Sequence, residues 1–272
     1  MTSQSDRLNF QSKLSSSRKI TILTGAGVSA ESGIATFRGA GGFWRRYQAQ
    51  DLASPEAWER DPGLVWEFYN YRRSASRDAV PNPAHRAIAM LEARWRNAGG
   101  TFTVLTQNID DLHEQAGSQS VVHLHGSIWH VRCLACGEVE PNRNIPITAA
   151  YEGSGSPDPE ARSRRFTEAD LPHCHCGGLQ RPHVVWFGEM LESKNLIAAA
   201  NAIDECNLLL VVGTSAVVHP AAGFVDVAKQ FGTTIAEANI EASAVNDLCD
   251  YFFEGKAGEM LPSLLDVEPT WG

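Results

Sequence analysis

The segment Lys19-Ile-Thr-Ile-Leu-Thr24 is a short run of apolar and β-branched residues that stops at Gly25. Such a run predicts a buried strand, and the residues from Val28 onward can open a helix. A strand, a tight glycine turn and a helix in this order begin a βαβ unit, the building block of parallel sheets. This segment therefore favours an α/β fold over all-α and all-β folds.

Comparable runs recur along the chain, with helical stretches between most of them. We expect further strands at 101–106, 121–124, 208–212 and 233–238. A helix at 83–97 has Asn82 as its cap and stops before Gly99, and another at 220–231 stops at Gly232. Strands that alternate with helices of this length predict an open, doubly wound parallel sheet of the Rossmann-like type.

Two segments interrupt the alternation. The first, 39–81, is aromatic and helical, and Ser54-Pro55 and Asp61-Pro62 look like helix caps followed by first-turn prolines. The second, 131–178, holds two pairs of cysteines. We expect these two insertions to form a small helical and zinc-binding domain. The Rossmann-like domain would then be discontinuous and comprise 8–38, 82–130 and 179–272.

Composition narrows the class of protein. The chain has 272 residues and a formal net charge of −9, which argues against a nucleic-acid surface, because phosphate binding needs clustered Lys and Arg. No apolar run approaches the length of a membrane span, so we expect no membrane partner. Residues 1–19 are rich in serine and lack the apolar core of a secretory signal. We expect an intracellular protein of the mitochondrial matrix, the cytosol or both.

The loop Gly25-Ala-Gly27-Val-Ser-Ala30 fits the dinucleotide-binding fingerprint, with Ala in the last place. We expect its glycines to allow close backbone approach and the helix that follows to present free N–H groups to a pyrophosphate. The alternative is a glycine turn needed only for packing. A dehydrogenase would place an acidic residue for the ribose about 20 residues further on, where this chain has Phe43-Trp-Arg-Arg-Tyr47, which weakens a hydride-transfer interpretation.

Several longer motifs occur in a fixed order along the chain. They are Gly25-Ala-Gly-Val-Ser-Ala-Glu-Ser-Gly-Ile-Ala-Thr-Phe-Arg-Gly39, Thr106-Gln-Asn-Ile-Asp110, His123-Leu-His-Gly126, Val185-Trp-Phe-Gly-Glu189 and Gly213-Thr-Ser215. Together they resemble the sirtuin family over nearly the whole chain. The resemblance implies NAD as cofactor and an enzyme that removes acyl groups from lysine side chains, giving nicotinamide, 2′-O-acyl-ADP-ribose and free lysine.

The resemblance also assigns roles to individual residues. It makes His125 the catalytic base, a role that suits histidine because its pKa lies near neutral pH. Taken alone, His125 could not be told from a structural strand histidine such as His123, and only the motif around it selects it. Asn108 and Asp110 would position the nicotinamide and its ribose. The residues assigned to NAD are Gly25, Ala26, Gly27, Ala30, Glu31, Thr36, Phe37, Arg38, Gln107, Asn108, Ile109, Asp110, Gly213, Thr214, Ser215, Asn239, Ile240, Glu241 and Ala257.

Four cysteines have the number and type of ligands for a closed, structural Zn²⁺ site: Cys133, Cys136, Cys174 and Cys176. The first pair has the usual two-residue spacing. The second pair departs from the family pattern because only His175 separates its members, so His173 or His175 could replace one thiolate. The remaining cysteines, at 206 and 249, lie in apolar surroundings and are interpreted as core thiols.

A helix predicted around residue 69 places Tyr69 and Arg72 on one face, since residues three apart are neighbours on a helix. The ordinary interpretation is an amphipathic helix with a snorkelling arginine. However, Tyr-x-x-Arg here resembles the sirtuin class that removes succinyl, malonyl and glutaryl groups, and Ala49 and Ala53 match small residues of that class. The resemblance assigns the substrate backbone to a strand formed by Val185, Trp186, Phe187, Gly188 and Glu189.

We therefore expect an NAD-dependent protein-lysine deacylase that acts on acidic acyl groups and weakly on acetyl groups. Its partners would be acyl-lysine proteins or peptides, and the chain would be a monomer. Two alternatives use the same cofactor cleavage: protein deacetylation and mono-ADP-ribosyl transfer. A third is an NAD-binding or zinc-binding module without turnover, which the joint presence of His125, Asn108 and Asp110 argues against.

Overall fold

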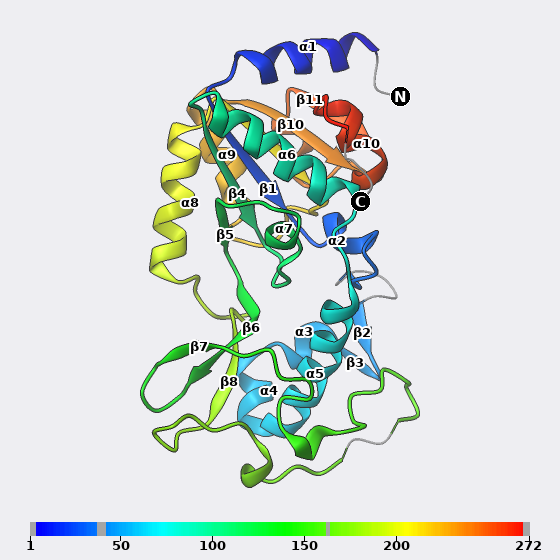
Figure 1. The fold of residues 1–272 in the computed structure, drawn as a ribbon, viewed down its shortest axis with the longest axis vertical. Helices are drawn as coiled ribbons and strands as arrows, with labels where there is room; N and C mark the ends of the chain where they lie inside the picture. Colours follow the sequence, from blue (N-terminus) through cyan, green and yellow to red (C-terminus); the bar gives the residue numbers. More distant parts are fainter. Residues whose placement is uncertain (1–3, 37–41, 162–163, 269–272) are drawn as a thin grey trace. The chain divides into compact units, whose positions relative to one another are not determined.

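The computed structural model describes residues 4–36, 42–161 and 164–268. The chain forms two compact units, coloured by sequence in Figure 1. The large unit comprises Met1–Ser32, Val80–Leu124 and Leu191–Gly272, and the small unit comprises Gly33–Ala79 and His125–Met190. No helix in the described part of the chain is long and apolar enough to cross a bilayer.

The large unit is built on a six-stranded parallel sheet in the order β11-β10-β9-β1-β4-β5. Its strands are β1 (Lys19–Thr24), β4 (Thr101–Thr106), β5 (Val121–His123), β9 (Leu208–Val212), β10 (Thr234–Asn239) and β11 (Tyr251–Glu254). From β1 the chain first adds β4 and β5 on one side and then returns to add β9, β10 and β11 on the other. This reversal confirms the doubly wound sheet expected from the sequence.

Helices cover both faces of this sheet (Figure 1). The large unit contains α1 (Gln4–Ser16), α2 (Gly27–Ala30), α6 (Pro83–Asn97), α7 (Leu112–Gln115), α8 (Ser193–Glu205), α9 (Gly223–Gln230), α10 (Ala257–Leu264) and the 3₁₀ turn η4 (Asn246–Leu248). On α6, Ala84, Ala87, Ile88 and Leu91 recur at helical spacing and are fully buried against the sheet. Consecutive residues of β1, such as Ile22 and Leu23, point to opposite faces and are both buried, as a strand covered on both sides requires.

The small unit has a three-stranded antiparallel sheet in the order β7-β6-β8, a two-stranded hairpin and a helical segment. Its elements are β2 (Phe43–Trp44), β3 (Tyr47–Gln48), α3 (Ala49–Leu52), α4 (Pro55–Arg60), α5 (Pro62–Asp78), β6 (Gly126–Cys133), β7 (Val139–Pro141), β8 (Gln180–Val184) and the turns η2 (Ala149–Tyr151) and η3 (Glu168–Asp170). The predicted caps form: Ser54 Oγ accepts the amide of Ala57 and Asp61 Oδ1 accepts that of Leu64.

The boundaries differ from the sequence expectation in specific places. Because β6 and β8 pair with each other, residues 126–130 and 179–184 lie in the small unit and not in the large one. The helix expected at 220–231 begins only at Gly223, and α2 is a single turn of four residues.

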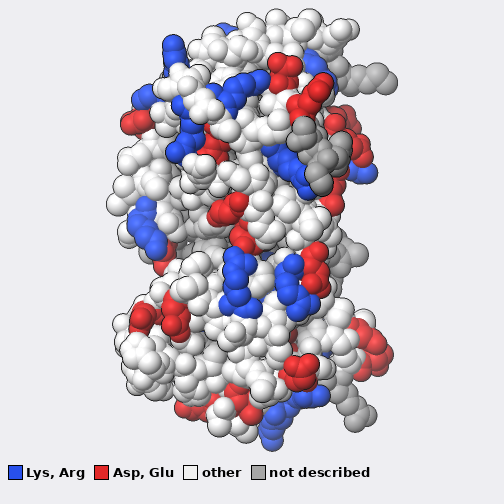
Figure 2. All heavy atoms as spheres, viewed as in Figure 1, with Lys and Arg blue, Asp and Glu red and all other residues white. Residues whose placement is uncertain are grey.

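Figure 2 shows basic side chains lying among acidic ones in both units on the face drawn.

Candidate functional site

The carboxyl ends of three neighbouring strands of the large unit lie level with one another. Thr24, the last residue of β1, is in register with Thr106 of β4 and with Val212 of β9. The two threonines are joined directly, since Thr24 Oγ1 donates to Thr106 Oγ1 at 2.9 Å. Ligands of open α/β sheets bind at this edge, where the strand order reverses. The assigned segments 25–31, 107–110 and 213–215 all begin here.

The glycine loop packs directly against the loop that follows β9. The Gly25 amide donates to Val212 O at 3.0 Å and the Gly27 amide to Gly213 O at 2.8 Å. A Cβ atom on Gly27 would lie 2.7 Å from Gly213 O, and one on Gly213 would lie 2.6 Å from the Val28 nitrogen. Gly213 also has φ +58, a conformation that costs free energy for any residue with a side chain. Glycine is therefore required by close backbone approach at both positions.

This packing corrects one expectation. The N-terminus of the helix after the glycine loop was expected to offer free N–H groups to a pyrophosphate. Instead, Gly27 donates to Gly213 O, Val28 to Gly25 O and Ser29 to Ala26 O. Because α2 is only one turn long, its first amides are satisfied by the loop itself and by the neighbouring strand end.

Ser29 lies at the centre of a buried polar network. Asn108 Nδ2 donates to Ser29 Oγ at 3.0 Å, and Ser29 Oγ donates to Asp110 Oδ2 at 3.2 Å. The side chains of Asn108 and Asp110, both assigned to the nicotinamide ribose, are thus joined through one hydroxyl. Burial raises the pKa of Asp110, although the Leu112 amide and Ser29 oppose this effect.

Two fully buried histidines complete the network, and sequence reasoning missed both of them. His85 Nε2 lies 3.3 Å from Ser29 Oγ, and His113 Nε2 lies 3.1 Å from Thr24 Oγ1. Their rings meet edge to face, with centroids 4.9 Å apart. Burial lowers the pKa of His85 to about 3 and that of His113 well below its usual value, so both are neutral at physiological pH. Neither is signalled by a local motif, because the network joins three separate segments of the chain.

The segments assigned to the adenosine half are also fixed by the large unit. Asn239 Nδ2 donates to Thr214 O at 2.7 Å, and Gln107 Nε2 donates to Thr214 Oγ1 at 3.0 Å. The fully buried Glu237 accepts the amide of Ser243 at 2.9 Å and so holds the turn that carries Ile240 and Glu241. Glu237 is a further residue that the sequence analysis did not identify.

Two other assigned residues meet at the start of α10. Glu31 Oε2 accepts the Gly258 amide at 2.7 Å, next to Ala257, the first residue of that helix. A carboxylate at a helix N-terminus is favourable because it pairs with unsatisfied amides. Glu31 therefore ties the glycine-loop segment to α10. Four other assigned residues lie in or next to the segments described above that follow β1, β4 and β9: Ala26, Ala30, Ile109 and Ser215. Thr36 lies in the small unit, and Phe37 and Arg38 fall outside the described residues.

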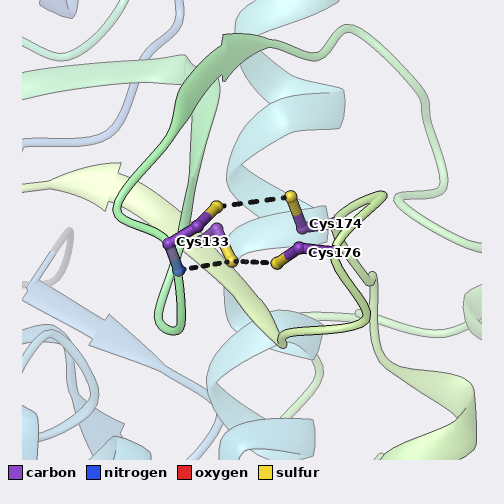
Figure 3. A group of neighbouring side chains, drawn as sticks. Cys133, Cys174 and Cys176 are labelled. Atoms are coloured by element: carbon purple, nitrogen blue, oxygen red, sulfur yellow. Dashed lines mark hydrogen bonds between the residues drawn. The ribbon is translucent and has the colours of Figure 1, made fainter.

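The four predicted zinc ligands converge in the small unit (Figure 3). The Sγ atoms of Cys133 and Cys176 are 3.5 Å apart, those of Cys136 and Cys174 are 3.8 Å apart, and all four lie within 4.8 Å of one another. Tetrahedral Zn²⁺ with Zn–S bonds of about 2.3 Å requires sulfur atoms about 3.8 Å apart. Hydrogen bonds from the Cys136 and Ala135 amides lower the pKa of the Cys133 thiol to about 6, whereas the pKa values of Cys136 and Cys174 are raised by their hydrogen bonds with neighbouring thiols. The residues present fit a structural zinc ion.

The two histidines considered as replacement ligands have other contacts. His173 Nδ1 lies 2.9 Å from Leu171 O, whereas Nδ1 of the exposed His175 lies 3.4 Å from Glu138 Oε2 and 3.5 Å from Cys174 Sγ. Because all four sulfurs already reach one another, neither histidine is needed to complete the set. A turn with Gly177 at φ +84 lets the Cys-x-Cys pair direct both sulfurs inward.

The residues assigned to the substrate are also joined within the small unit. Trp186 Nε1 donates to Tyr69 Oη at 3.0 Å, and the Phe187 amide donates to Ala53 O at 2.9 Å. The Arg72 guanidinium carbon lies 5.6 Å from the centroid of the Tyr69 ring. Tyr69 is buried on α5, and Arg72, one turn further along the same helix, is half-buried. The α5 face predicted from the Tyr-x-x-Arg spacing is thus formed.

One substrate expectation needs correction, because Val185–Glu189 is not a strand. β8 ends at Val184, and a turn with Gly188 at φ +87 follows. The turn is fixed by Arg181, whose guanidinium makes two hydrogen bonds to Glu189, at 2.6 and 2.9 Å, and stacks 3.3 Å from the Trp186 ring centroid. Glu189 Oε2 in turn accepts the Trp186 amide, so it holds a turn instead of an extended strand. Sequence reasoning missed Arg181, which the unusual charge within a buried strand could have indicated.

His125, the assigned base, lies at the start of the small unit's second segment, directly before β6. Its carbonyl oxygen accepts the Val185 amide at 2.9 Å, so its main chain is held beside the substrate segment. Gly126 follows with φ +75, and a Cβ atom there would collide with His183 O. The His-Gly pair therefore needs its glycine for backbone packing.

Comparison with known proteins extends these findings. A model of the Sir2 family matches residues 25–220. The chain is 50% identical over 265 residues to the zebrafish (Danio rerio) mitochondrial NAD-dependent protein deacylase sirtuin-5, covering 96% of this chain and 87% of that protein. It is 49% identical over 264 residues to an NAD-dependent protein deacylase of Daphnia pulex, covering 96% of each.

Solved structures agree with the fold. A crystal structure of a Sir2 homologue in complex with NAD is 40% identical, with a TM-score of 0.81 over 95% of this chain and 92% of that one. A Sir2 complex with a p53 peptide and NAD⁺ is 29% identical, with a TM-score of 0.78 over 95% of this chain and 96% of that one. The similarity therefore covers both units.

Proposed function

The chain belongs to the Sir2 family and is an NAD-dependent protein deacylase, and we propose that it prefers lysine acyl groups that end in a carboxylate. Succinyl, malonyl and glutaryl groups are such substrates, and acetyl is a poorer one. The observation that carries the proposal is the contact between Arg72 and Tyr69, which the Trp186 indole ties to the assigned substrate segment.

The chemistry of this pair suits an anionic acyl end. A guanidinium offers two parallel N–H groups to a carboxylate, and a phenol adds a third donor. Burial raises the pKa of Tyr69 even though the Arg72 charge lowers it, so the phenol keeps its proton at neutral pH. Among the described residues, Tyr69 Oη accepts from Trp186 and makes no second hydrogen bond, so its proton can be donated to a ligand.

Two small residues on and next to α3 belong to the proposed acyl site. Ala53 and Ala49 are both buried alanines, and Ala53 is held against the substrate segment by the Phe187 amide. Helix α3, which carries Ala49 and is followed by Ala53, packs against α5, the helix of Tyr69 and Arg72. We infer that the small residues accommodate the extra carbons of succinyl and glutaryl groups.

For catalysis we assign His125 as the base that accepts a proton from a ribose hydroxyl of the bound cofactor. NAD supplies the ADP-ribose that accepts the acyl group and nicotinamide as the leaving group. Asn108 and Asp110, locked together through Ser29, hold the nicotinamide ribose in one orientation, which favours a single attack geometry. The loops that begin at Gly25, Gly213 and Asn239 hold the rest of the cofactor.

The cysteine cluster has a structural role in this proposal. Cys133, Cys136, Cys174 and Cys176 would hold one Zn²⁺ ion, which cross-links the two loops that carry them. Residues 134–138 and 175–177 of these loops are exposed and have little packing of their own, so the ion would supply much of the loops' stability.

We propose further that the chain acts on acyl-lysine proteins as a monomer without nucleic acid, in agreement with its net charge of −9. Its vertebrate relatives carry the word mitochondrial in their names, and we propose the mitochondrial matrix, with the cytosol as a second location.

A pair of peptides tests the acyl preference. One carries succinyl-lysine and the other the terminal carboxamide of the same chain length, which has equal size but no charge. We expect kcat/KM to be at least tenfold higher for succinyl-lysine, since hydrogen bonds to a charged group are the stronger ones. Equal values would contradict the proposal that Arg72 and Tyr69 bind a carboxylate, but they would not contradict the deacylase activity.

A further inference from the structure

His123, the last residue of β5, makes a hydrogen bond through each of its ring nitrogens. Nδ1 lies 3.2 Å from the main-chain oxygen of Asn108, and Nε2 lies 2.6 Å from Glu114 Oε1. The histidine is largely buried, with 19% of its side chain exposed, whereas Glu114 is partly exposed on α7. The catalytic roles proposed above do not use His123.

The partners determine the protonation of the ring. A carbonyl oxygen and a carboxylate are both acceptors only, whereas a neutral imidazole has one donor and one acceptor nitrogen. Both contacts are satisfied when both ring nitrogens carry a proton, so His123 is an imidazolium paired with Glu114. Flipping the ring would place carbon atoms at both contacts, so the observed orientation is the one that the partners support.

The surroundings agree with a cation. Burial alone lowers the pKa of His123, but the Glu114 hydrogen bond and charge, the Asn108 carbonyl and the Asp110 charge together raise it above its ordinary value. His113 of α7 is a further titratable group near His123, and it is neutral. From α8, Asn195 Nδ2 donates to the His123 carbonyl at 2.8 Å and fixes the main chain.

The hydrogen bond between His123 and the Asn108 carbonyl connects the ion pair to a residue assigned to NAD. Asn108 is held at three atoms: its amide donates to Thr106 Oγ1 at 3.1 Å, its side chain to Ser29 Oγ at 3.0 Å, and its carbonyl accepts from His123. We propose that His123, held as an imidazolium by Glu114, is a positioning residue that fixes the Asn108–Asp110 segment for cofactor binding. This inference rests on the proposed function, because it takes Asn108 and Asp110 to contact NAD.

The pairing has a defined dependence on pH. Below its folded-state pKa, His123 is charged and both hydrogen bonds are made. As the pH rises through that raised pKa, the ring loses one proton. The short hydrogen bond to the Glu114 carboxylate retains the proton on Nε2, so Nδ1 loses its proton and its lone pair then faces the Asn108 carbonyl. NAD affinity should therefore fall on the alkaline side, and this fall should be specific to the His123–Glu114 pair.

The first test is an NMR titration of the imidazole nitrogens in the full chain, compared with Glu114→Gln. An amide can donate to a neutral Nε2, so we expect this variant to lower the His123 pKa toward its ordinary value of about 6.5. Glu205→Gln is the matched control, because Glu205 pairs with Lys19 at the surface and does not contact His123. A neutral His123 at pH 7 in the unaltered chain would overturn the inference.

The second test measures NAD affinity by calorimetry. His123→Leu removes the donor to the Asn108 carbonyl, and we expect the Kd for NAD to rise about tenfold. His123→Asn keeps an N–H near the Nδ1 position and should recover most of that loss, which a purely structural role would not predict. Unchanged affinity in His123→Leu overturns the positioning role alone, whereas an unaltered chain that binds no NAD overturns the proposed function.

Discussion

Replacing Arg72 by methionine tests the acyl preference at its source. Arg72 is half-buried on α5, and its guanidinium carbon lies 5.6 Å from the ring centroids of both Phe68 and Tyr69. Methionine has a similar length and keeps an apolar contact with these rings. The change therefore removes the positive charge and the two parallel N–H donors with little loss of packing.

The size of the effect follows from the hydrogen bonds that would be lost. A hydrogen bond to a charged group contributes about 1.5–3 kcal/mol, and a guanidinium can make two to one carboxylate. Two such hydrogen bonds would contribute about 3–6 kcal/mol in total. Because water partly screens Arg72, we take the lower end, about 3 kcal/mol. Since about 1.4 kcal/mol is a factor of ten, kcat/KM for succinyl-lysine should fall about 100-fold. An acetyl group has no carboxylate, so its kcat/KM should change by less than about threefold.

The assay follows deacylation of one peptide sequence carrying either acyl group, for the unaltered chain and for Arg72→Met. Arg77→Met is the matched control, because Arg77 lies on the same helix but is exposed and paired with Asp78. It should leave both activities within about twofold, as expected for surface changes. If Arg72→Met lowers kcat/KM equally for the two peptides, Arg72 does not bind the acyl carboxylate and has a structural role instead.

Four further predictions concern other parts of the molecule. His125→Tyr should abolish turnover with a circular dichroism spectrum like that of the unaltered chain, and near-normal activity would exclude His125 as the base. Gly213→Ala forces a side chain into φ +58 and should lower the free energy of unfolding in urea by at least about 1–3 kcal/mol; an unchanged unfolding midpoint would contradict the close packing. Cys176→Ser should lose bound zinc by metal analysis and lower the melting temperature, whereas full zinc content would remove Cys176 from the ligand set. The pKa of buried His85 is depressed to about 3, so the unfolded chain binds more protons below about pH 6.5 and stability should fall by up to about 1.4 kcal/mol per pH unit between about pH 6 and 3. His85→Gln should make this slope shallower, and an identical slope would show that His85 is not neutral in the folded chain.

Much of the fold could be predicted from the sequence because its signals are local. The strand at 19–24 is a continuous apolar run that ends at a glycine, and β1 has these bounds. The caps at Ser54, Asp61 and Asn82 each depend on a side chain and an amide two or three residues away, and all three form. The four cysteines expected to bind zinc were identified from their number and residue type, and their sulfur atoms lie within 4.8 Å of one another.

The remaining features depend on contacts between distant segments. The hydrogen bond between Ser29 and His85 joins residues 56 positions apart, and no periodicity or motif encodes it. The Val185–Glu189 segment has apolar residues typical of a strand, yet the ion pair of Glu189 with Arg181 turns it. Likewise, the hydrogen bond from the Gly27 amide to Gly213 O depends on where β9 ends.

The most direct measurement of the central claim is mass spectrometry of one peptide carrying succinyl-lysine or acetyl-lysine in turn, with nicotinamide release followed in parallel. We predict that the peptide is deacylated only in the presence of NAD, that each acyl group lost is matched by one nicotinamide released, and that succinyl-lysine reacts faster than acetyl-lysine. Nicotinamide release with no loss of acyl groups would instead indicate ADP-ribosyl transfer, and faster acetyl removal would contradict the proposed preference for acidic acyl groups.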